Sequence, residues 1–377
     1  MQEKETLHLL TLNRTGCFNS TTMLQLYKKA GNATAVIEHH QDIKSIMPDC
    51  PRRLADALKD IDQAKQRAER EMDYAIQHGI SIMGYNDDTY PERLKNCEDA
   101  PLVLFFKGTG DLNRRRVISI VGTRHCTPYG HDCTEQFVAR LKQLCPDTLI
   151  VSGLAYGVDI CAHRAALANG MDTVAVLAHG LDYLYPNKHR ETATEMLAHG
   201  GLLTEFFTNT NADKMNFIRR NRIVAGMADA TILVESAAQG GGLITARIAG
   251  SYNREVFTFP GRTTDVYSAG CNHLIRDNKA ALICNADDFV NAMAWQCDAQ
   301  LKEARKQGIE RELFPELTPQ EQSVTGILSK NNDLPIGMLA VQSGISMAQL
   351  SEMLFQLEMK GLVRCLAGGV YHLIKNN

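Results

Sequence analysis

Short apolar runs alternate with amphipathic stretches through the middle of the chain. We expect strands over 118–122, 149–153, 173–178, 202–205, 230–235 and 255–261. Helices are predicted between them, near 131–144, 162–168, 190–199, 217–228 and 243–252. Strands this apolar are covered on both faces, which predicts a parallel sheet with crossover helices. The fold class is therefore α/β, with an extended Rossmann-like parallel sheet core.

The first part of the chain has a helical pattern. Residues 1–66 carry leucines at helical intervals, with a break at Thr15-Gly16. They predict a helical domain of the SAM or helix-hairpin-helix type, although a purely structural helical cap fits the pattern as well. The core domain is expected over 67–296, where two further strands at 80–83 and 101–106 precede the alternating region.

The last part of the chain forms a separate pattern. Residues 297–316 are charged and poor in aromatics, which predicts a linker. Capping boxes are predicted at Thr318–Glu321 and at Ser346–Gln349, and a hairpin is predicted around Gly368-Gly369. Three helices followed by a hairpin indicate a winged helix over 317–377.

Composition limits the chemistry. The 377 residues have a net charge of −3, so any binding of anions must be local. Eleven cysteines form no CxxC or Cys/His ligand spacing, which favours buried thiols in a reducing compartment over a metal site. The start MQEKETLHLL has no basic region before an apolar run, and no segment is long enough to span a bilayer. We therefore expect a cytoplasmic protein with no membrane partner.

One exception to this neutral composition is the segment KMNFIRRNR at 214–222. Guanidinium groups bind phosphate oxygens and an aromatic ring stacks on a base, so the segment suits a nucleic acid strand. Helical spacing places Lys214, Phe217 and Arg220 on one face, and Arg219 and Arg222 on another. A solvated basic helix with its ring in the core is the alternative. Asn221 lies between the last two arginines and is included among the candidate DNA-binding residues.

Further candidates follow the expected strands, at the edge where parallel sheets bind ligands. They are Gly122, Thr123 and Arg124 after one strand, Ser152 and Gly153 after the next, and Gly240, Gly241, Gly242 and Thr245 before a helix. Glycines opening a helix leave amides free to bind anions. A P-loop lysine and a dinucleotide fingerprint are both missing, so no cofactor is expected. Asp159 and His163, one helical turn apart, are interpreted as a capping or packing pair.

These segments, taken in order, resemble a known family. The runs VGTR (121–124), SGLAYGVDICAH (152–163), GLDYLYP (180–186), FIRRNRIVAG (217–226), GGGLITA (240–246) and AGCNHLI (269–275) are similar to those of the DNA-processing protein A family, DprA/Smf. The resemblance implies a protein that binds single-stranded DNA without catalysis. Such proteins protect incoming DNA during natural transformation and load the RecA recombinase, usually as homodimers.

The resemblance also implies roles for residues. Arg124 would contact a DNA phosphate, Lys214 and Phe217 would line the pocket, and Arg220–Arg222 match the family's Arg-Asn-Arg motif. Gly240–Gly242 match the glycine turn beside it. One departure is Ala178-His179-Gly180, where many members have Gly-Thr-Gly, and it affects the expected shape of the pocket.

Two other functions are weighed against this one. Nucleotide phosphoribohydrolases of the lysine-decarboxylase-like group use a related fold, but they carry an acid after the glycine turn. Here no Asp or Glu follows GGGLITARIA until Glu255, so we expect no catalytic residue. A transcription regulator would need a basic recognition helix, yet 346–360 holds Glu352, Glu358 and a single base, Lys360.

Overall fold

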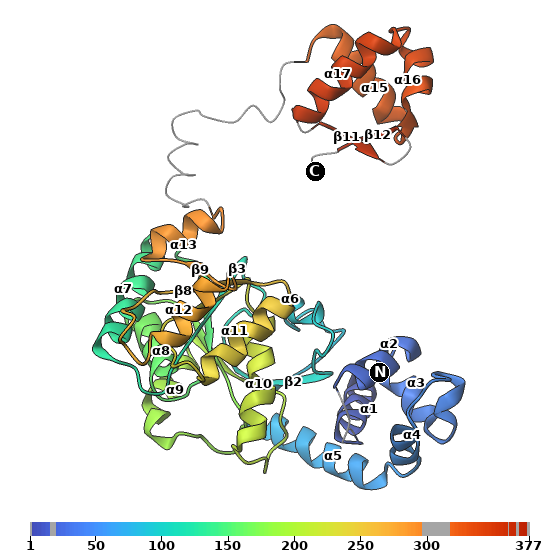
Figure 1. Cartoon of the computed structure of the whole chain (residues 1–377). Helices are drawn as coiled ribbons and strands as arrows, with labels where there is room; N and C mark the ends of the chain where they lie inside the picture. Colours follow the sequence, from blue (N-terminus) through green and yellow to red (C-terminus); the bar gives the residue numbers. More distant parts are fainter. Residues whose placement is uncertain (1, 16–19, 296–316, 361, 367–368, 375–377) are drawn as a thin grey trace. The chain divides into compact units, whose positions relative to one another are not determined.

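The computed structural model describes residues 2–15, 20–295, 317–360, 362–366 and 369–374 (Figure 1). The chain forms two compact units, Met1–Ala299 and Gln300–Asn377. The predicted linker at 297–316 lies outside the described residues. So do Gly16 of the predicted helix break and Gly368 of the predicted hairpin turn. Among the helices that are described, none is long and apolar enough to cross a bilayer.

The first unit is built on one sheet. Within the described residues nine strands pair in the order β1 (Ser81–Gly84), β2 (Val103–Gly108), β6 (Gly200–Thr204), β5 (Thr173–Val176), β4 (Thr148–Ser152), β3 (Arg116–Val121), β7 (Ala230–Leu233), β8 (Glu255–Thr258) and β9 (Ala281–Leu282). The strands from β6 to β9 in this order are parallel, whereas β1 and β2 add an antiparallel edge. Every strand expected in the core is present.

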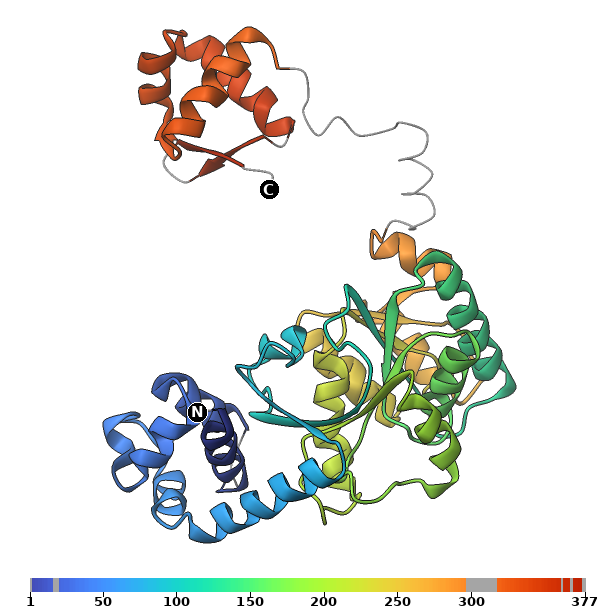
Figure 2. The ribbon, with the colours of Figure 1, turned by 180° about the vertical axis from the view of Figure 1, so that it is seen from behind.

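Helices cover both faces of this sheet (Figures 1 and 2). One face carries α7 (Pro128–Leu144), α8 (Val158–Ala168), α9 (Arg190–Met196) and α13 (Ala286–Ala292). The other carries α10 (Lys214–Gly226), α11 (Gly241–Ser251) and α12 (Ala269–Arg276). Strand alternation explains this: Ile118 and Ile120 of β3 pack toward α7 and α8, while Val117 and Val121 pack toward α10 and α11. The predicted α/β class with a largely parallel core is confirmed.

The N-terminal helices are α1 (Gln2–Thr15), α2 (Ser20–Ala30), α3 (Ala33–Glu38), the 3-10 helix η1 (His40–Ser45), α4 (Arg52–Lys59) and α5 (Asp62–Gln77). The domain boundary predicted after residue 66 falls inside α5. On that helix, Glu71 accepts hydrogen bonds from the Thr208 amide at 2.8 Å and its hydroxyl at 2.7 Å. The helices and the sheet also share a hydrophobic cluster. The SAM or helix-hairpin-helix assignment stays a prediction.

The second unit is a winged helix with its own core. It contains α15 (Pro319–Lys330), β10 (Leu334–Pro335), α16 (Ile336–Ser343), α17 (Met347–Met359), β11 (Val363–Leu366) and β12 (Val370–Leu373). Thr318 and Glu321 form the predicted capping box. At the second predicted box, Ser346 caps the Gln349 amide, but its hydroxyl donates to the Gln349 side chain. The β10 strand joins the predicted hairpin in a three-stranded sheet.

Candidate nucleic-acid interface

The strand order reverses between β3 and β7, which are neighbours in the sheet although three strands, β4, β5 and β6, separate them in the chain. Ligands of open parallel sheets bind outside the carboxyl ends of the strands at such a point. A cavity of about 650 Å³ lies there, and it is lined by Val121, Gly122, Thr123, Arg124, Gly153, Ala155, Asp159, Lys214, Phe217, Ile218, Arg220, Asn221, Val224, Ala237, Gln239, Gly240, Gly241, Gly242, Ile244 and Thr245.

Glycines let the first turn of α11 lie directly against the loop after β3. A Cβ on Gly242 would come within 3.2 Å of Gly122 Cα, and within 2.6 Å of Leu233 Cδ1. Gly240 is the N-cap of α11 and offers no side chain to cap the helix. The amides of this first turn can therefore bind an anion in the cavity.

Phe217 forms an aromatic surface between charges. Its half-buried ring lies 4.9 Å from the Arg124 guanidinium carbon and 5.9 Å from that of Arg220, measured to the ring centroid. The ring of Tyr185, which is 46% exposed, lies 6.2 Å away. Arg124 and Lys214 are exposed, and neither forms an ion pair with another described residue. Both cations are thus available to a ligand.

Arg220 is a buried member of the cavity wall. Its Nη1 donates to the Gly153 carbonyl at 2.6 Å and to the Val176 carbonyl, so it joins the ends of β4 and β5. Burial lowers the pKa of Arg220 to about 10, and Asp159 opposes this shift. Burial in turn raises the pKa of Asp159, against the attraction of Arg220. These two opposite charges largely compensate, which leaves Arg124 and Lys214 to attract an anion.

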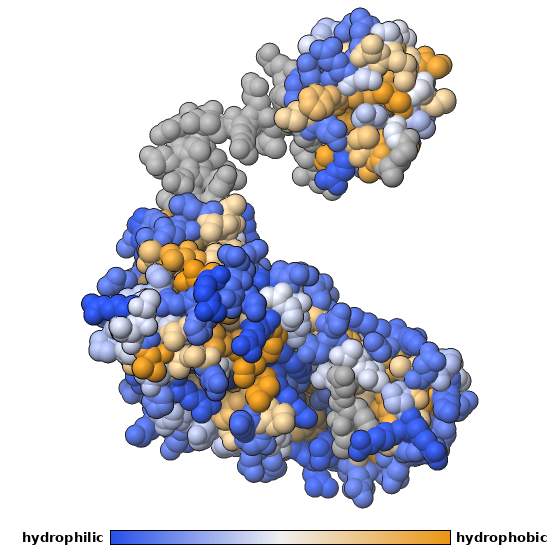
Figure 3. Space-filling view, viewed as in Figure 1, coloured by the Kyte–Doolittle hydropathy of each residue, from blue (hydrophilic) through white to orange (hydrophobic). Residues whose placement is uncertain are grey.

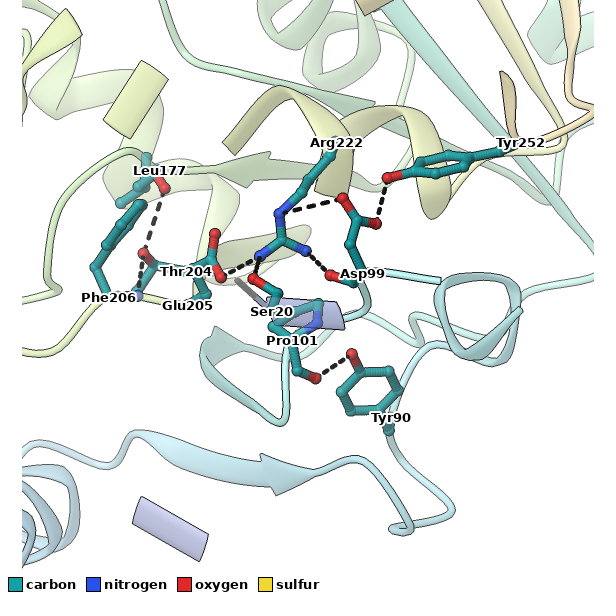
Figure 4. Close-up of polar contacts among 10 residues, drawn as sticks. All are labelled: Ser20, Tyr90, Asp99, Pro101, Leu177, Thr204, Glu205, Phe206, Arg222 and Tyr252. Carbon is teal, nitrogen blue, oxygen red and sulfur yellow. Dashed lines mark hydrogen bonds and ion pairs between the residues drawn. The ribbon is translucent and has the colours of Figure 1, made fainter. Parts of the chain in front are cut away.

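Arg222 lies on the far side of α10 in a buried polar network (Figure 4). It forms an ion pair with Glu205, donates to the Asp99 carbonyl, and has its Nε 3.9 Å from the Asp99 carboxylate. Burial alone would lower the pKa of Arg222, but Glu205 and Asp99 outweigh it and raise that pKa. Arg219 and Arg222 line a different cavity, of about 520 Å³. The predicted site residues are therefore divided between two places.

Three other predicted residues have structural partners. The Ser152 hydroxyl is buried and donates to the Ile120 carbonyl at 2.6 Å, and Ser152 does not line the cavity. Thr123 accepts from the His125 amide at 3.1 Å, and Thr245 is also buried, although both line the cavity. Asn221 is half-buried and accepts from Arg220 Nε at 3.3 Å.

Asp159 and His163 do not act as a pair. His163 is fully buried with its Nδ1 2.7 Å from the Thr173 hydroxyl, and burial lowers its pKa to about 3. Asp159 instead lines the cavity, where it is the one residue of a metal-ligating type among the described lining residues. Asp159 is also buried and accepts from the Ala155 amide at 3.3 Å, so the capping or packing interpretation fits both residues, whereas the position of Asp159 in the cavity wall comes only from the fold.

His179, at the departure from the family pattern, orders the tyrosine loop. Its Nδ1 donates to the Gly180 carbonyl at 2.7 Å, because its Nε2 accepts from the Tyr185 amide at 3.2 Å. Its ring also stacks on Tyr183 at 4.4 Å between centroids. The sequence contained the signal for this aromatic loop in GLDYLYP, but the proximity of Tyr185 to Phe217 comes only from the fold.

Comparison with known proteins shows the family to which the chain belongs. The family model described as DNA recombination-mediator protein A matches residues 81–294, and a model of the DprA winged helix domain matches 312–369. The chain belongs to the DprA/Smf family. It is 34% identical over 315 residues to the putative DNA processing protein DprA of Mycobacterium tuberculosis, covering 80% of this chain and 79% of that protein.

Two solved structures of the DprA/Smf family are similar to this chain. The structure of DprA from Streptococcus pneumoniae aligns with a TM-score of 0.65 and 32% identity, over 75% of this chain and 95% of that one. The structure of DNA processing protein A from Helicobacter pylori, which concerns that protein's single-stranded DNA binding mode, aligns with a TM-score of 0.52 and 28% identity, over 57% of this chain and 95% of that one.

Proposed function

We propose that the cavity at the β3/β7 edge holds single-stranded DNA. The observation that carries the proposal is the Phe217 ring between Arg124 and Arg220, beside the uncapped amides of α11. A base can stack on the ring while its phosphates meet Arg124, Lys214 and the helix amides. The H. pylori relative, whose structure concerns single-stranded DNA binding, supports the same ligand for this chain.

The strand must be single because stacking on Phe217 needs an unpaired base face. In a duplex both faces of each base are covered by neighbouring base pairs. A base would have to leave the duplex to enter the cavity of about 650 Å³, at a cost of a few kcal/mol. Binding through phosphates and a ring face is tolerant of sequence. We therefore expect the affinity for single-stranded DNA to depend on salt concentration, and the affinity for duplex DNA to be much lower.

We further propose that the bound strand is protected and passed to the RecA recombinase during natural transformation, by a homodimer in the cytoplasm. The support is membership of a family described as a DNA recombination mediator. Loading can be measured as the rate at which RecA forms filaments on DNA coated with single-strand binding protein. If the wild-type protein does not change the rate of RecA filament formation, the proposed role in RecA loading is wrong.

The proposal includes no catalysis, and Asp159 provides the sharpest challenge to it. This buried carboxyl lines the cavity with a raised pKa, as the acid of a phosphoribohydrolase would. The Arg220 cation stabilises its charged form, against the effect of burial. We expect no free base when nucleoside monophosphates are incubated with the protein and analysed by chromatography. Release of base that disappears in Asp159→Asn would establish the enzyme instead.

The test of DNA binding compares single cation deletions. Arg124→Ala and Lys214→Ala each remove one phosphate contact, so the slope of log affinity against log salt should fall by about 0.7. Affinity is measured by fluorescence anisotropy with a labelled oligothymidine and its duplex. The matched control is Arg53→Ala, which removes an exposed cation from α4. If the two cavity variants bind as wild type does, the site is wrong.

We propose that the winged helix contacts protein rather than DNA. Residues 318–377 hold four basic and four acidic side chains, so they offer no positive field. Apolar residues do reach the surface of this unit (Figure 3). Val341 is 80%, Phe355 63% and Met359 76% exposed. A chain that ends before residue 317 should keep its affinity for single-stranded DNA. A large loss of affinity would contradict this role.

A further inference from the structure

Three side chains of metal-ligating type meet on the face of the sheet opposite Phe217. His131 and Glu135 lie four residues apart in the first turns of α7, and Cys161 lies in the first turn of α8. One donor atom from each, a ring nitrogen, a carboxylate oxygen and the thiol sulfur, lie within 4.8 Å of one another. Residues at i and i+4 share one helix face, so both α7 donors point toward the same neighbouring helix.

The donor set matches a borderline-soft divalent cation. Zn²⁺ takes nitrogen, sulfur and carboxylate oxygen at about 2.0–2.3 Å, which puts tetrahedral donors about 3.4–3.7 Å apart. The donors lie within 4.8 Å of one another, and two of them, on His131 and Glu135, belong to exposed side chains that are free to rotate toward an ion. We propose that His131, Glu135 and Cys161 form a Zn²⁺ site with water in its fourth position.

The linear sequence indicated no such site. The third ligand, Cys161, comes from another helix and lies 26 residues after Glu135, so the site has no recognisable Cys/His spacing in the sequence. Packing of α7 on α8 brings it close, since Phe137 and Val138 of one helix share a core cluster with Ala162 and Ala165 of the other. The proposal assigns a metal to Cys161, whereas the spacing of the cysteines alone favours buried thiols.

Charge around the thiol defines how the ion would bind. Burial, together with Glu135, raises the pKa of Cys161 to about 11, while Thr134 and Arg164 oppose the shift. The thiol is therefore protonated at neutral pH, and the ion must displace that proton on binding. A bound Zn²⁺ would then balance both the thiolate that forms on binding and the Glu135 carboxylate.

The ion would act as a clamp behind the DNA cavity. The α8 residue Val158 already donates its amide to the Thr123 carbonyl at 3.1 Å. The Thr127 amide and hydroxyl, at the start of α7, donate to Glu235 at 2.9 and 2.7 Å. Joining α7 to α8 would restrain both ends of the loop that carries Arg124, without touching the ligand. The clamp is independent of the proposed DNA binding and can be measured without DNA.

The test uses the full chain with Co²⁺ and Zn²⁺ alone. Co²⁺ should give visible d–d bands and a near-ultraviolet thiolate charge-transfer band, at one equivalent per chain. Zn²⁺ should displace it, with the affinity measured by competition against a chromophoric chelator. Glu135→Gln and His131→Ala should each lower Zn²⁺ affinity by at least about tenfold. Loss of a residue that only hydrogen-bonds a metal ligand already costs about tenfold, and loss of the ligand itself should cost more. Cys161→Ser should abolish the charge-transfer band.

Matched controls separate this site from adventitious binding. Asp132→Asn removes an exposed acid from the same turn of α7, and Cys284→Ser removes an exposed thiol elsewhere. Neither should change the affinity. Zn²⁺ should also raise the melting temperature of wild type but not of Glu135→Gln. The proposal is overturned if no charge-transfer band forms, or if Glu135→Gln and His131→Ala bind Zn²⁺ as wild type does. Because those two side chains are exposed, their variants remain informative even where Cys161→Ser fails to fold.

Discussion

Replacing Arg222 by Met should destabilise the protein and leave its DNA site intact. The Arg222 side chain is only 9% exposed and forms an ion pair with Glu205, which is 14% exposed. It also donates to the Asp99 carbonyl. Met fills a similar volume but removes the cation, so a buried carboxylate loses its partner (Figure 4).

The magnitude follows from the protonation of Glu205. Burial already raises the pKa of this carboxyl, and Arg222 is the main group that opposes the rise. Without Arg222, Glu205 must take up a proton in the folded state. From its ordinary pKa of 4.5, that costs at most about 3 kcal/mol at pH 7, at 1.36 kcal/mol per unit, and the raised wild-type pKa already accounts for part of it. The melting temperature should fall by about 2–4 °C for each kcal/mol of the remaining loss.

The sign of the pH dependence is fixed by the same carboxyl. In the variant, the folded pKa of Glu205 lies far above its unfolded pKa, so stability relative to wild type is retained below pH 4.5 and lost as pH rises through the folded pKa. Urea denaturation followed by circular dichroism at pH 5 and pH 7.5 should therefore show the larger deficit at pH 7.5. Adding Glu205→Gln should recover part of it.

Arg219→Met is the matched control, because Arg219 is an exposed arginine on the same helix. It should change the free energy of unfolding by no more than about 0.5 kcal/mol. Well below its melting temperature, Arg222→Met should bind single-stranded DNA with wild-type affinity. A variant with wild-type stability and impaired binding would refute the reasoning and return Arg222 to the ligand site.

Three further predictions concern the cavity itself. Phe217→Leu should lower affinity for single-stranded DNA by about 5- to 150-fold without changing the salt slope, since it removes stacking but no charge; an altered slope would count against a stacking role. Asp159→Asn should raise that affinity by removing a carboxylate, and the gain should shrink as pH falls and the wild-type carboxyl, whose pKa burial raises, becomes neutral; weaker binding by this variant would contradict the charge argument. Gly153→Ala would place a Cβ 2.4 Å from Arg220 Nη1 and should cost about 1–3 kcal/mol in urea denaturation, whereas unchanged stability would show that Arg220 moves freely.

Much of the core could be predicted because its strands are apolar on both faces. The alternation of Ile118 and Ile120 with Val117 and Val121 requires helices on either side, and helices are found there. The hydrogen bond between Glu71 of α5 and Thr208, 137 positions away, could not be predicted, because no local pattern joins such distant residues. The two-residue strand β9 was also missed, because Ala281 and Leu282 are too few to form a pattern.

For the site, helical spacing and the family motif divide the residues of α10 in different ways. Periodicity placed Phe217 and Arg220 on one face of α10, and Arg219 and Arg222 on another, as the structure has them. The family motif grouped all of them as binding residues. What the periodicity lacked was the environment of each face: a cavity on one side, and Glu205 with its neighbours on the other.

The amino-acid sequence alone specifies the α/β core, the glycine turns after its strands and a local positive charge on an otherwise nearly neutral protein. These depend on backbone conformation and residue type, which are local properties. The division of the arginines, the position of Asp159 beside Arg220, and the meeting of His131, Glu135 and Cys161 depend on tertiary packing. Whether a charged side chain is a ligand contact or a structural ion pair is decided by which distant group faces it, and only the folded chain determines that.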